Sequence, residues 1–287
     1  MPEPRIALAT TRDLEVLDAD EESLLAHLPQ ADVVAWEEDV DWGGYAAVIL
    51  RSTWNYTEHL DDFLAWLERV DAVTRLWNPL PVLRWNTDKR YLADAAAAGI
   101  PTVPTVFVEP GEQAPADALA GRVVVKPTVG AGSKGAKLFH DDPAGATEHV
   151  AALHAMGKVA MIQPYLDQVD DQGETALVYI GGEFSHAARK AAILSRDMSW
   201  STGIYADEKV VAAQATPAER ELADRILTTL PGIVPEAADL AYARIDLLPT
   251  ADGPVVLELE LTEPSLFLGL DPEAPARAAA AFARLLA

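Results

Sequence analysis

One stretch decides the fold, and it is Val123-Val124-Val125-Lys126-Pro127-Thr128-Val129-Gly130-Ala131-Gly132-Ser133-Lys134-Gly135-Ala136-Lys137-Leu138-Phe139. The β-branched run at 123–125 predicts a strand that is packed on both faces. A lysine at the end of such a run is costly to bury unless an anion meets it. The glycines in the loop let successive backbone N–H groups turn inward and bind an anion. The stretch therefore predicts a strand, a phosphate-binding loop and a second strand.

Two common phosphate-binding motifs do not fit this stretch. The Gly-x-x-x-x-Gly-Lys-Ser/Thr order of a Walker A loop is absent. No helix-forming run opens directly after the glycines, as it would in a Rossmann fingerprint. The alternative interpretation is a glycine-rich hairpin whose lysines are solvated.

Composition limits the classes of function. The chain has 287 residues, half of them hydrophobic, which is enough for two or three subdomains. With 45 acidic against 22 basic residues, the net charge of −23 argues against binding to nucleic acid or to an anionic membrane. The absence of cysteine excludes disulfides, a thiol nucleophile and cysteine-bound metal. No long apolar run is present at the N-terminus or elsewhere, and we expect a cytoplasmic protein.

The first part of the chain alternates between strand and helix patterns. Strands are expected at 6–9, 32–36 and 45–50, and helices at 21–28 and 61–70. This alternation predicts a parallel α/β layer, in which ligands gather at the carboxyl ends of the strands. The third strand ends in Arg51, Ser52, Thr53, Trp54 and Asn55, which are candidates for substrate binding. An ordinary strand-to-helix loop is the alternative.

The middle of the chain has prolines at its start. We expect an extended segment at 77–84 and then a helix from Trp85 to Ala98, with Asn86 or Thr87 as its N-cap. Lys89 lies in the first turn of that helix, where a solvated lysine is the alternative to a ligand-binding one. A strand at 100–108, a helix at 144–155 and a strand at 159–163 are also expected.

The last part of the chain combines hairpins with helices. Strands at 174–180 and 183–190 are expected to join through Gly181-Gly182. The polar and aromatic segment 195–209 lacks periodicity, and a loop of that length is expected to cover a site. A helix at 217–229, strands at 241–248 and 255–261, and a helix at 274–286 complete the prediction.

A set of carboxylates falls on the last two predicted strands. Glu258 and Glu260 are two apart and therefore point to one face, and Arg244 and Asp246 do the same on the preceding strand. A hairpin could bring the three carboxylates together, and they would repel unless a cation lay between them. Oxygen ligands without sulfur or histidine favour Mg²⁺. An acidic, half-exposed strand face is the alternative in so acidic a chain.

Together these motifs resemble the ATP-grasp superfamily of carboxylate–amine ligases, which includes glutathione synthetase and D-alanine–D-alanine ligase. The resemblance runs from the N-terminal layer to the last strand. It implies an α/β (α+β) fold in which residues 1–84 form an N-terminal substrate domain. Residues 85–166 would form the central lid domain, and residues 167–287 would form the C-terminal domain, which carries the magnesium site. ATP would bind between these two domains.

The resemblance also assigns roles to residues. Those assigned to ATP are Lys89, Lys126, Gly132, Ser133, Gln163, Tyr165, Leu166 and Glu174. Mg²⁺, as two ions, is assigned to Asp246, Glu258 and Glu260, although the third position is often asparagine in relatives. Arg189 and Arg244 would hold the γ-phosphate and the acyl-phosphate oxygens. Ala176 stands where some relatives have an arginine, which leaves that role unfilled or displaced.

Three shorter runs narrow the resemblance to the O-ureidoserine cyclo-ligases of D-cycloserine biosynthesis. They are Thr10–Asp13, Ser52–Tyr56 and His186–Lys190, the last of which adds Lys190 to the substrate-binding candidates. The implied reaction turns a small amino-acid-like carboxylate into an acyl phosphate, which an amine-type nucleophile of the same molecule attacks. An intermolecular amino-acid or peptide ligase, a phosphotransferase and a non-catalytic nucleotide-binding module are alternatives. The oligomeric state is not decided by the sequence, and a homodimer is one of the alternatives.

Overall fold

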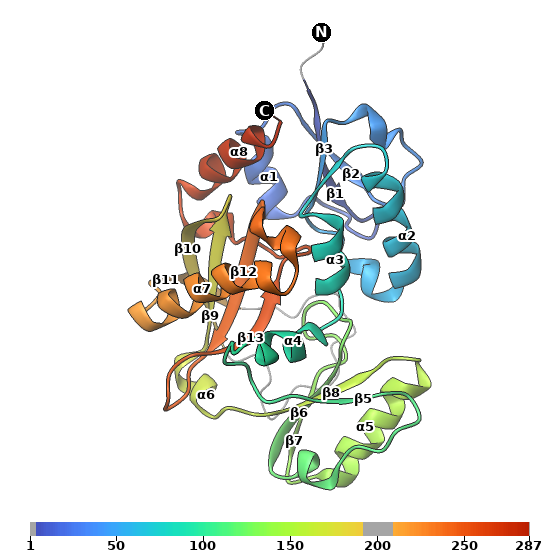
Figure 1. Ribbon diagram of the computed structural model, residues 1–287, viewed down its shortest axis with the longest axis vertical. Coiled ribbons are helices and arrows are strands. Elements are labelled where there is room, and N and C mark those ends of the chain that lie inside the picture. Colours follow the sequence, from blue (N-terminus) through green and yellow to red (C-terminus); the bar gives the residue numbers. More distant parts are fainter. Residues whose placement is uncertain (1–3, 192–208, 287) are drawn as a thin grey trace.

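The structure is a computed structural model that describes residues 4–191 and 209–286. Three β-sheets follow one another along the long axis of the molecule (Figure 1). A four-stranded sheet lies at the top, a five-stranded sheet in the middle and a second four-stranded sheet at the bottom. Most of the predicted covering loop, residues 195–208, lies outside the described residues.

The N-terminal layer is a parallel sheet with strand order β2-β1-β3-β4, as the strand–helix alternation predicts. Its elements are β1 (Ile6–Thr10), α1 (Ala19–Leu25), β2 (Ala31–Ala35), η1 (Trp42–Gly44), β3 (Ala47–Leu50), η2 (Trp54–Glu58), α2 (Leu60–Asp71) and β4 (Arg75–Trp77). Helix α2 buries Phe63, Trp66, Leu67 and Val70 against one face of the sheet. These side chains recur every three or four residues, which places them on one side of a helix.

The central unit is an antiparallel sheet with order β5-β8-β6-β7. Its elements are β5 (Val106–Val108), η3 (Ala116–Leu119), β6 (Arg122–Pro127), β7 (Lys137–His140), α5 (Pro143–Ala155) and β8 (Ala160–Pro164). Strands β6 and β7 pair directly and enclose the glycine-rich loop. The predicted strand, loop and strand of the deciding stretch are therefore confirmed as secondary structure.

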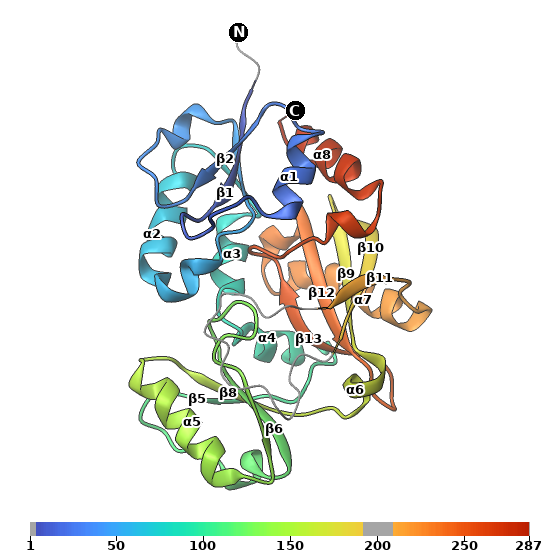
Figure 2. The same cartoon turned by 180° about the vertical axis from the view of Figure 1, so that it is seen from behind.

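The C-terminal unit is an antiparallel sheet with order β11-β10-β9-β12-β13. Its elements are α6 (Gln168–Gln172), β9 (Glu174–Ile180), β10 (Glu183–Lys190), β11 (Val210–Ala213), α7 (Pro217–Thr229), η4 (Leu230–Gly232), η5 (Pro235–Ala238), β12 (Tyr242–Leu248), β13 (Val255–Glu260), η6 (Leu268–Leu270) and α8 (Ala274–Arg284). A reciprocal capping box between Thr216 and Glu219 starts α7. Viewed from behind, α8 lies beside α1 of the N-terminal layer (Figure 2).

The expected extended segment 77–84 is wrong, and the helix expected at 85–98 is present only in its second half. The chain forms helix α3 (Leu80–Asn86), then a short turn, and then helix α4 (Tyr91–Ala97). Pro79 and Pro81 start α3 rather than interrupt it, because proline is tolerated in the first turn of a helix. The predicted boundary between the first and second domains, at 84/85, falls inside α3, and the three-domain division stays a prediction.

Asn86 is not an N-cap but holds the edge of the five-stranded sheet. Its side-chain amide donates to the Leu259 carbonyl and accepts from the Leu261 N–H, both at 2.7 Å. The Tyr91 hydroxyl accepts the N–H of Leu259 at 2.9 Å. Strand β13 is the edge strand of its sheet, and an unpaired edge exposes backbone donors and acceptors. The two side chains satisfy those groups and fix β13 in place.

Two buried side chains of the N-terminal layer hold a loop of the C-terminal unit. The Asp20 carboxylate, at the start of α1, accepts three backbone N–H groups at 2.5 to 3.1 Å, from Leu266, Phe267 and Leu268. The Arg51 guanidinium donates to the Pro264 carbonyl at 2.6 Å. Because a buried charged group needs such partners, these contacts fix the 264–268 loop against the N-terminal layer.

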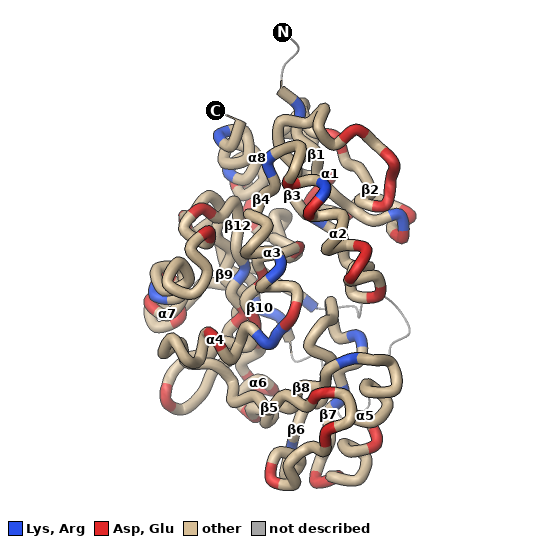
Figure 3. Tube along the Cα trace, turned by 45° about the vertical axis from the view of Figure 1, so that its right-hand side comes forward, with Lys and Arg blue, Asp and Glu red and all other residues tan. Residues whose placement is uncertain are grey.

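None of the helices in the described ranges combines the length and the apolar character that a membrane-crossing segment requires. Lys, Arg, Asp and Glu are spread over all three units (Figure 3). The connection after β2 is strongly acidic, since it carries Glu37, Glu38, Asp39 and Asp41.

Candidate active site

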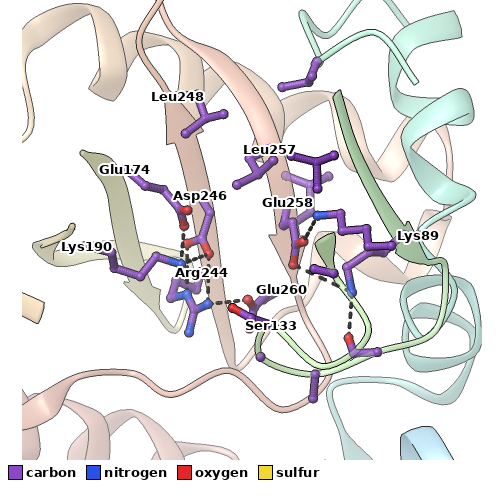
Figure 4. Close-up of a pocket in the computed structure, with 18 of the residues that line it drawn as sticks. Lys89, Ser133, Glu174, Lys190, Arg244, Asp246, Leu248, Leu257, Glu258 and Glu260 are labelled. Atoms are coloured by element: carbon purple, nitrogen blue, oxygen red, sulfur yellow. Dashed lines mark hydrogen bonds and ion pairs between the residues drawn. The ribbon is translucent and has the colours of Figure 1, made fainter. Parts of the chain in front are cut away.

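A cavity of about 460 Å³ lies between the central sheet, the C-terminal sheet and the N-terminal layer. Its floor is built from neighbouring strands, in which Arg244 of β12 lies directly opposite Glu260 of β13, and Asp246 opposite Glu258. Residues paired in this way point to the same face of a sheet. In Figure 4, Arg244, Asp246 and Glu260 lie together with Glu174 and Lys190, whereas Glu258 points toward Lys89 on the other side of the floor.

On one side of the floor, two cations surround Asp246. The Arg244 guanidinium donates to both Asp246 carboxylate oxygens at 2.9 Å, and Lys190 Nζ lies 2.7 Å from Oδ2. Lys190 also pairs with Glu174, and Arg244 with Glu260. Burial alone would raise the pKa of Asp246, but Arg244 and Lys190 hold it well below its ordinary value. The Asp246 carboxylate is therefore charged throughout the neutral range.

On the other side, lysines of the central unit reach down to Glu258. Lys126 Nζ, from β6, lies 2.5 Å from Glu258 Oε1. Lys89 Nζ lies 3.8 Å from Glu258 Oε2 and donates to the Gly130 carbonyl at 2.7 Å. Burial opposes ionisation, but Lys126 and Lys89 lower the pKa of Glu258 to about 2. The lysine in the apolar strand thus has an anionic partner, and that partner comes from a different sheet.

An apolar wall closes the end of the cavity away from the N-terminal layer. Val103, Val169, Leu248 and Leu257 pack there with Tyr165 and Leu166 of the segment after β8. The pairing between β5 and β8 ends at Ile162, so that β5 does not cover the residues that follow. The Gln163 side chain donates to Thr105 Oγ1 at 2.9 Å. A flat heteroaromatic ring fits such a wall, which presents backbone groups at its edge.

The structure brings most of the predicted site residues to this cavity. They are Trp54, Lys89, Lys126, Gly132, Ser133, Gln163, Tyr165, Leu166, Glu174, Lys190, Arg244, Asp246, Glu258 and Glu260. The ligand roles assigned to them stay predictions. Lys190 lies in the charged cluster with Glu174 and Asp246 rather than in a separate substrate subsite.

Arg189 is not brought to the cavity. Adjacent residues of a strand point to opposite faces, and Lys190 points inward. Arg189 instead donates to the Gln172 carbonyl at 2.9 Å. The structure therefore gives no support to a contact between Arg189 and phosphate.

Four residues of the run after β3 also lie elsewhere. Arg51 and Thr53 are buried, and Ser52 Oγ donates to the Glu21 carboxylate at 2.6 Å. Asn55 accepts the Trp36 indole N–H at 2.8 Å and lines a second cavity beyond the ends of β1 and β2. We expected all five residues of this run to contact substrate. Only Trp54 lines the main cavity, whereas Arg51, Ser52 and Asn55 bond to other parts of the fold.

Sequence reasoning missed the residues at the N-terminal end of the cavity. Tyr56, Glu263, Ser265 and Phe267 line it there. Trp54 Nε1 donates to the Glu263 carbonyl at 3.0 Å, and Arg244 Nη1 donates to the Ser265 carbonyl at 3.0 Å. Glu263 follows the metal-ligand candidate Glu260 by three positions, and this acidic side chain close to the predicted site could have marked it as a candidate.

The floor has the donor set of a magnesium site. Asp246, Glu258 and Glu260 supply carboxylate oxygens, which Mg²⁺ prefers, and neither sulfur nor imidazole lines the described part of the cavity. No three acidic or imidazole side chains within residues 4–191 and 209–286 are gathered around one point as metal ligands. Instead, lysine and arginine partners draw each carboxylate to its own side. The magnesium assignment stays a prediction.

Three carboxylates of the cavity are expected to make ligand-free stability depend on pH. Burial raises the pKa of Glu174 to about 8, that of Glu260 to about 7 and that of Glu263 to about 8, from an ordinary value of 4.5. The native state therefore holds protons that the unfolded chain has lost, and the free energy of unfolding falls as pH rises toward 8. We expect a loss of at least about 1.4 kcal/mol between pH 6.5 and 8, the equivalent of one pKa unit.

Urea unfolding across this pH range measures the effect. Glu174→Gln is the matched variant, because it removes one titrating carboxyl and should flatten the slope. Burial lowers the pKa values of His149 and His186. Their titration therefore raises the free energy of unfolding as pH increases up to about 6.5, and it adds little above that pH. A stability that is flat or rises from pH 6.5 to 8 contradicts the prediction.

Comparison with known proteins places the chain in a family. The sequence model described as "D-cycloserine synthetase DcsG, N-terminal domain" matches residues 6–78. Over 276 residues, the chain is 41% identical to "Cycloserine biosynthesis protein DcsG" from Streptomyces lavendulae, covering 89% of each chain. The chain belongs to the DcsG family. Members of this family have the ATP-grasp fold, and the chain is an ATP-grasp ligase, as its sequence motifs predict.

Solved structures agree with the family and with the fold. The crystal structure of D-cycloserine synthetase DcsG superposes with a TM-score of 0.89 at 38% identity, over 98% of this chain and 99% of that one. D-alanine–D-alanine ligase from Bacillus anthracis, complexed with ATP, gives 0.67 at 13% identity, covering 99% and 97%. At that identity the second match shows the fold alone, and it confirms the ATP-grasp architecture of the DcsG family.

Proposed function

We propose that the chain closes a ring within one amino-acid-like molecule by joining its carboxylate to its own amine-type nitrogen, while ATP is converted to ADP and phosphate. The observation that carries the proposal is the convergence of Lys89, Lys126, Lys190 and Arg244 on one cavity. Four such cations suit a triphosphate and a phosphoryl group in transfer. The names of the related proteins, cycloserine biosynthesis protein and D-cycloserine synthetase, support D-cycloserine as the product. The resemblance of three sequence runs to O-ureidoserine cyclo-ligases suggests O-ureidoserine as the substrate.

The apolar wall and the lysines suggest an orientation for the nucleotide. The adenine would lie on the apolar wall of Leu248 and Leu257, with its edge at the backbone after Gln163. The triphosphate would then extend toward Lys126 and Lys89, under the glycine-rich loop. Both lysines already hold Glu258, and an incoming phosphate competes with this carboxylate for them.

Magnesium is part of the proposal because the charges require it. The pKa values of Asp246 and Glu258 are lowered, so both of these carboxylates are ionised, and the triphosphate would bring further negative charge beside them. Asp246, Glu258 and Glu260 would hold the metal as two ions, in line with the donor set of the floor. When bound, Mg²⁺ neutralises phosphate oxygens and orients the γ-phosphoryl group.

The chemistry has two steps. In the first, a carboxylate oxygen of the substrate bonds to the γ-phosphorus while the bond to the bridging oxygen of ADP breaks. In the second, the nitrogen bonds to the acyl carbon, inorganic phosphate leaves, and the nitrogen loses a proton. With O-ureidoserine, the ring nitrogen then still carries the carbamoyl group, and its hydrolysis by one water molecule, which releases carbon dioxide and ammonia, would leave D-cycloserine. Arg244 is placed to stabilise the negative charge of both steps, because its guanidinium lies on the floor and is held by Asp246.

The test incubates the purified protein with Mg-ATP and O-ureidoserine, and follows ADP and the ring product by mass spectrometry. We expect one ADP for each ring. With ¹⁸O in the substrate carboxylate, one labelled oxygen should appear in the released phosphate. Amino acids supplied in pairs, such as D-alanine, provide the control.

Each other outcome identifies a different function. A linear dipeptide or other intermolecular amide would replace cyclisation with ligation between molecules. Unlabelled phosphate would exclude the acyl phosphate. Tight ATP binding without substrate-stimulated ADP release on any amino acid would overturn the proposed chemistry altogether.

A further inference from the structure

Glu263 differs from the other carboxylates that line the cavity. Glu174, Asp246, Glu258 and Glu260 each form an ion pair with a lysine or an arginine. In the part of the chain that the structure describes, Glu263 forms no such pair, although it is about as buried as Glu174. A buried carboxylate that lacks a cationic partner is energetically costly unless a ligand supplies the positive charge.

The N-terminal layer holds Glu263 by its side chain and its backbone. The Tyr56 hydroxyl donates to the Glu263 carboxylate, and the Trp54 indole donates to its carbonyl at 3.0 Å. Tyr56 is itself buried, which leaves its hydroxyl little freedom. A single hydroxyl satisfies only part of a carboxylate's capacity, since the two oxygens can accept several hydrogen bonds. The Glu263 carboxylate, which belongs to a residue that lines the cavity, therefore has capacity for further hydrogen bonds.

The loop after Glu263 is rigid and connects it to the reacting end of the cavity. Arg51 holds the carbonyl of Pro264, and Asp20 holds the N–H groups of 266–268. Within the same loop, the carbonyl of Ser265 accepts from Arg244 at 3.0 Å. Glu263 is thus held in the same loop as the carbonyl that accepts from Arg244, and both residues line the cavity.

We propose that Glu263, assisted by Tyr56, binds the ammonium group of an α-amino-acid substrate. The inference rests on the proposed function and extends it, because it makes the amino group a determinant of which acids are accepted. In an α-amino acid, the ammonium group and the carboxylate are attached to the same carbon. Binding of the substrate ammonium at Glu263 would therefore place the substrate carboxylate toward Arg244. A phosphate would be repelled here, since Glu260 is the nearest charged group along the chain and is also acidic.

The protonation behaviour of Glu263 agrees with such a role. Burial, and after it the neighbouring Glu260, raises the pKa of Glu263 to about 8. A cationic ligand would favour the ionised form and reverse that shift. The inference rests on the place of Glu263 in the cavity lining and on the absence of an ion pair to it among the described residues.

The test is a cycle that combines Glu263→Gln with a substrate analogue in which hydrogen replaces the α-amino group. Calorimetry measures the binding of each molecule to each protein in the presence of a non-hydrolysable ATP analogue and Mg²⁺. We expect the variant to bind O-ureidoserine about tenfold to a hundredfold more weakly, as befits a lost charge-assisted hydrogen bond. It should bind the deaminated analogue as well as the wild type does, because the two changes remove the same contact.

Controls separate this role from a general loss of structure. Glutamine keeps the shape of the side chain and can still accept from Tyr56, and the Michaelis constant for ATP should stay within about twofold, as expected when no contact with the nucleotide is lost. Glu183→Gln, an exposed acid at the start of β10, should leave every affinity unchanged. Tyr56→Phe should weaken binding of the amino acid by less than Glu263→Gln does.

Three results would overturn the inference. Equal weakening of both ligands by Glu263→Gln would show that the residue does not recognise the ammonium group. Unchanged affinity for O-ureidoserine would remove it from the subsite, and a raised magnesium requirement would make it a metal ligand instead. If wild-type protein neither binds nor cyclises any amino acid, the proposed function fails first and takes this inference with it.

Discussion

Replacing Asp246 by asparagine is expected to slow turnover about a hundredfold to a thousandfold, the range found when one preorganised electrostatic group is removed from an active site. The Asp246 side chain is 1% exposed and is held by both Arg244 and Lys190. Asparagine keeps its shape but removes the charge. The two cations would then repel each other, and the proposed metal site would lose a ligand. The measurement is the initial rate of ADP release during a magnesium titration.

Asp252→Asn is the control for this variant, because Asp252 lies exposed in the turn of the same β12–β13 hairpin. Removing one partner of a buried ion pair also costs stability, about 3–5 kcal/mol. Circular dichroism at the assay temperature therefore has to show a folded variant. If Asp246→Asn unfolds, Glu258→Gln takes its place. Turnover within tenfold of the wild type, with the fold intact, contradicts the assignment.

Replacing Lys126 by alanine is expected to weaken the binding of ATP about tenfold to a hundredfold, as for a lost hydrogen bond between charged groups. Lys126 is the residue of β6 that crosses the cavity and lies 2.5 Å from Glu258. Its loss would remove a phosphate partner and leave Glu258 with Lys89 alone. Titration calorimetry with Mg²⁺ and a non-hydrolysable ATP analogue measures the affinity.

Lys137→Ala supplies the matched comparison, since Lys137 is exposed on β7 and lies opposite Val125 in the same sheet. The variant removes one positive charge from the same sheet of the central unit, at a residue that does not line the cavity. Affinity that is the same in Lys126→Ala and in the wild type would exclude Lys126 from the nucleotide site. Equal losses in both variants would indicate a diffuse charge effect instead.

Local patterns in the sequence were sufficient for much of the fold. The valines before Lys126 and the glycines after it define two strands and a loop, because β-branched residues favour extended structure and glycines permit the turn. The alternation of strand and helix patterns likewise gave the parallel layer. In both cases the information lies within a few residues, and tertiary contacts only reinforce it.

Other features depend on partners that are distant in the sequence. Asn86 looked like a helix cap, but its amide bonds with β13, more than 170 residues away. Pro79 looked like a break, but it precedes a helix. Period-two alternation predicts that Arg189 and Lys190 face opposite sides, although only the packed sheet shows that Lys190 faces the cavity. Glu263 belongs to the same class, because its lack of a cation is visible only once the other pairs are known.

The contacts of Asp20 and Arg51 with the 264–268 loop have a mechanical consequence. They join the N-terminal layer to the five-stranded sheet, and the two share a hydrophobic core that includes Leu8 of β1 and Phe282 of α8. The central unit has a core of its own, drawn from residues between 108 and 162. The ion pair between Lys126 of the central sheet and Glu258 of the five-stranded sheet connects these two units across the cavity. Under the proposed function, an arriving triphosphate would compete with Glu258 for Lys126, so that binding of ATP would weaken the ion pair between the two units.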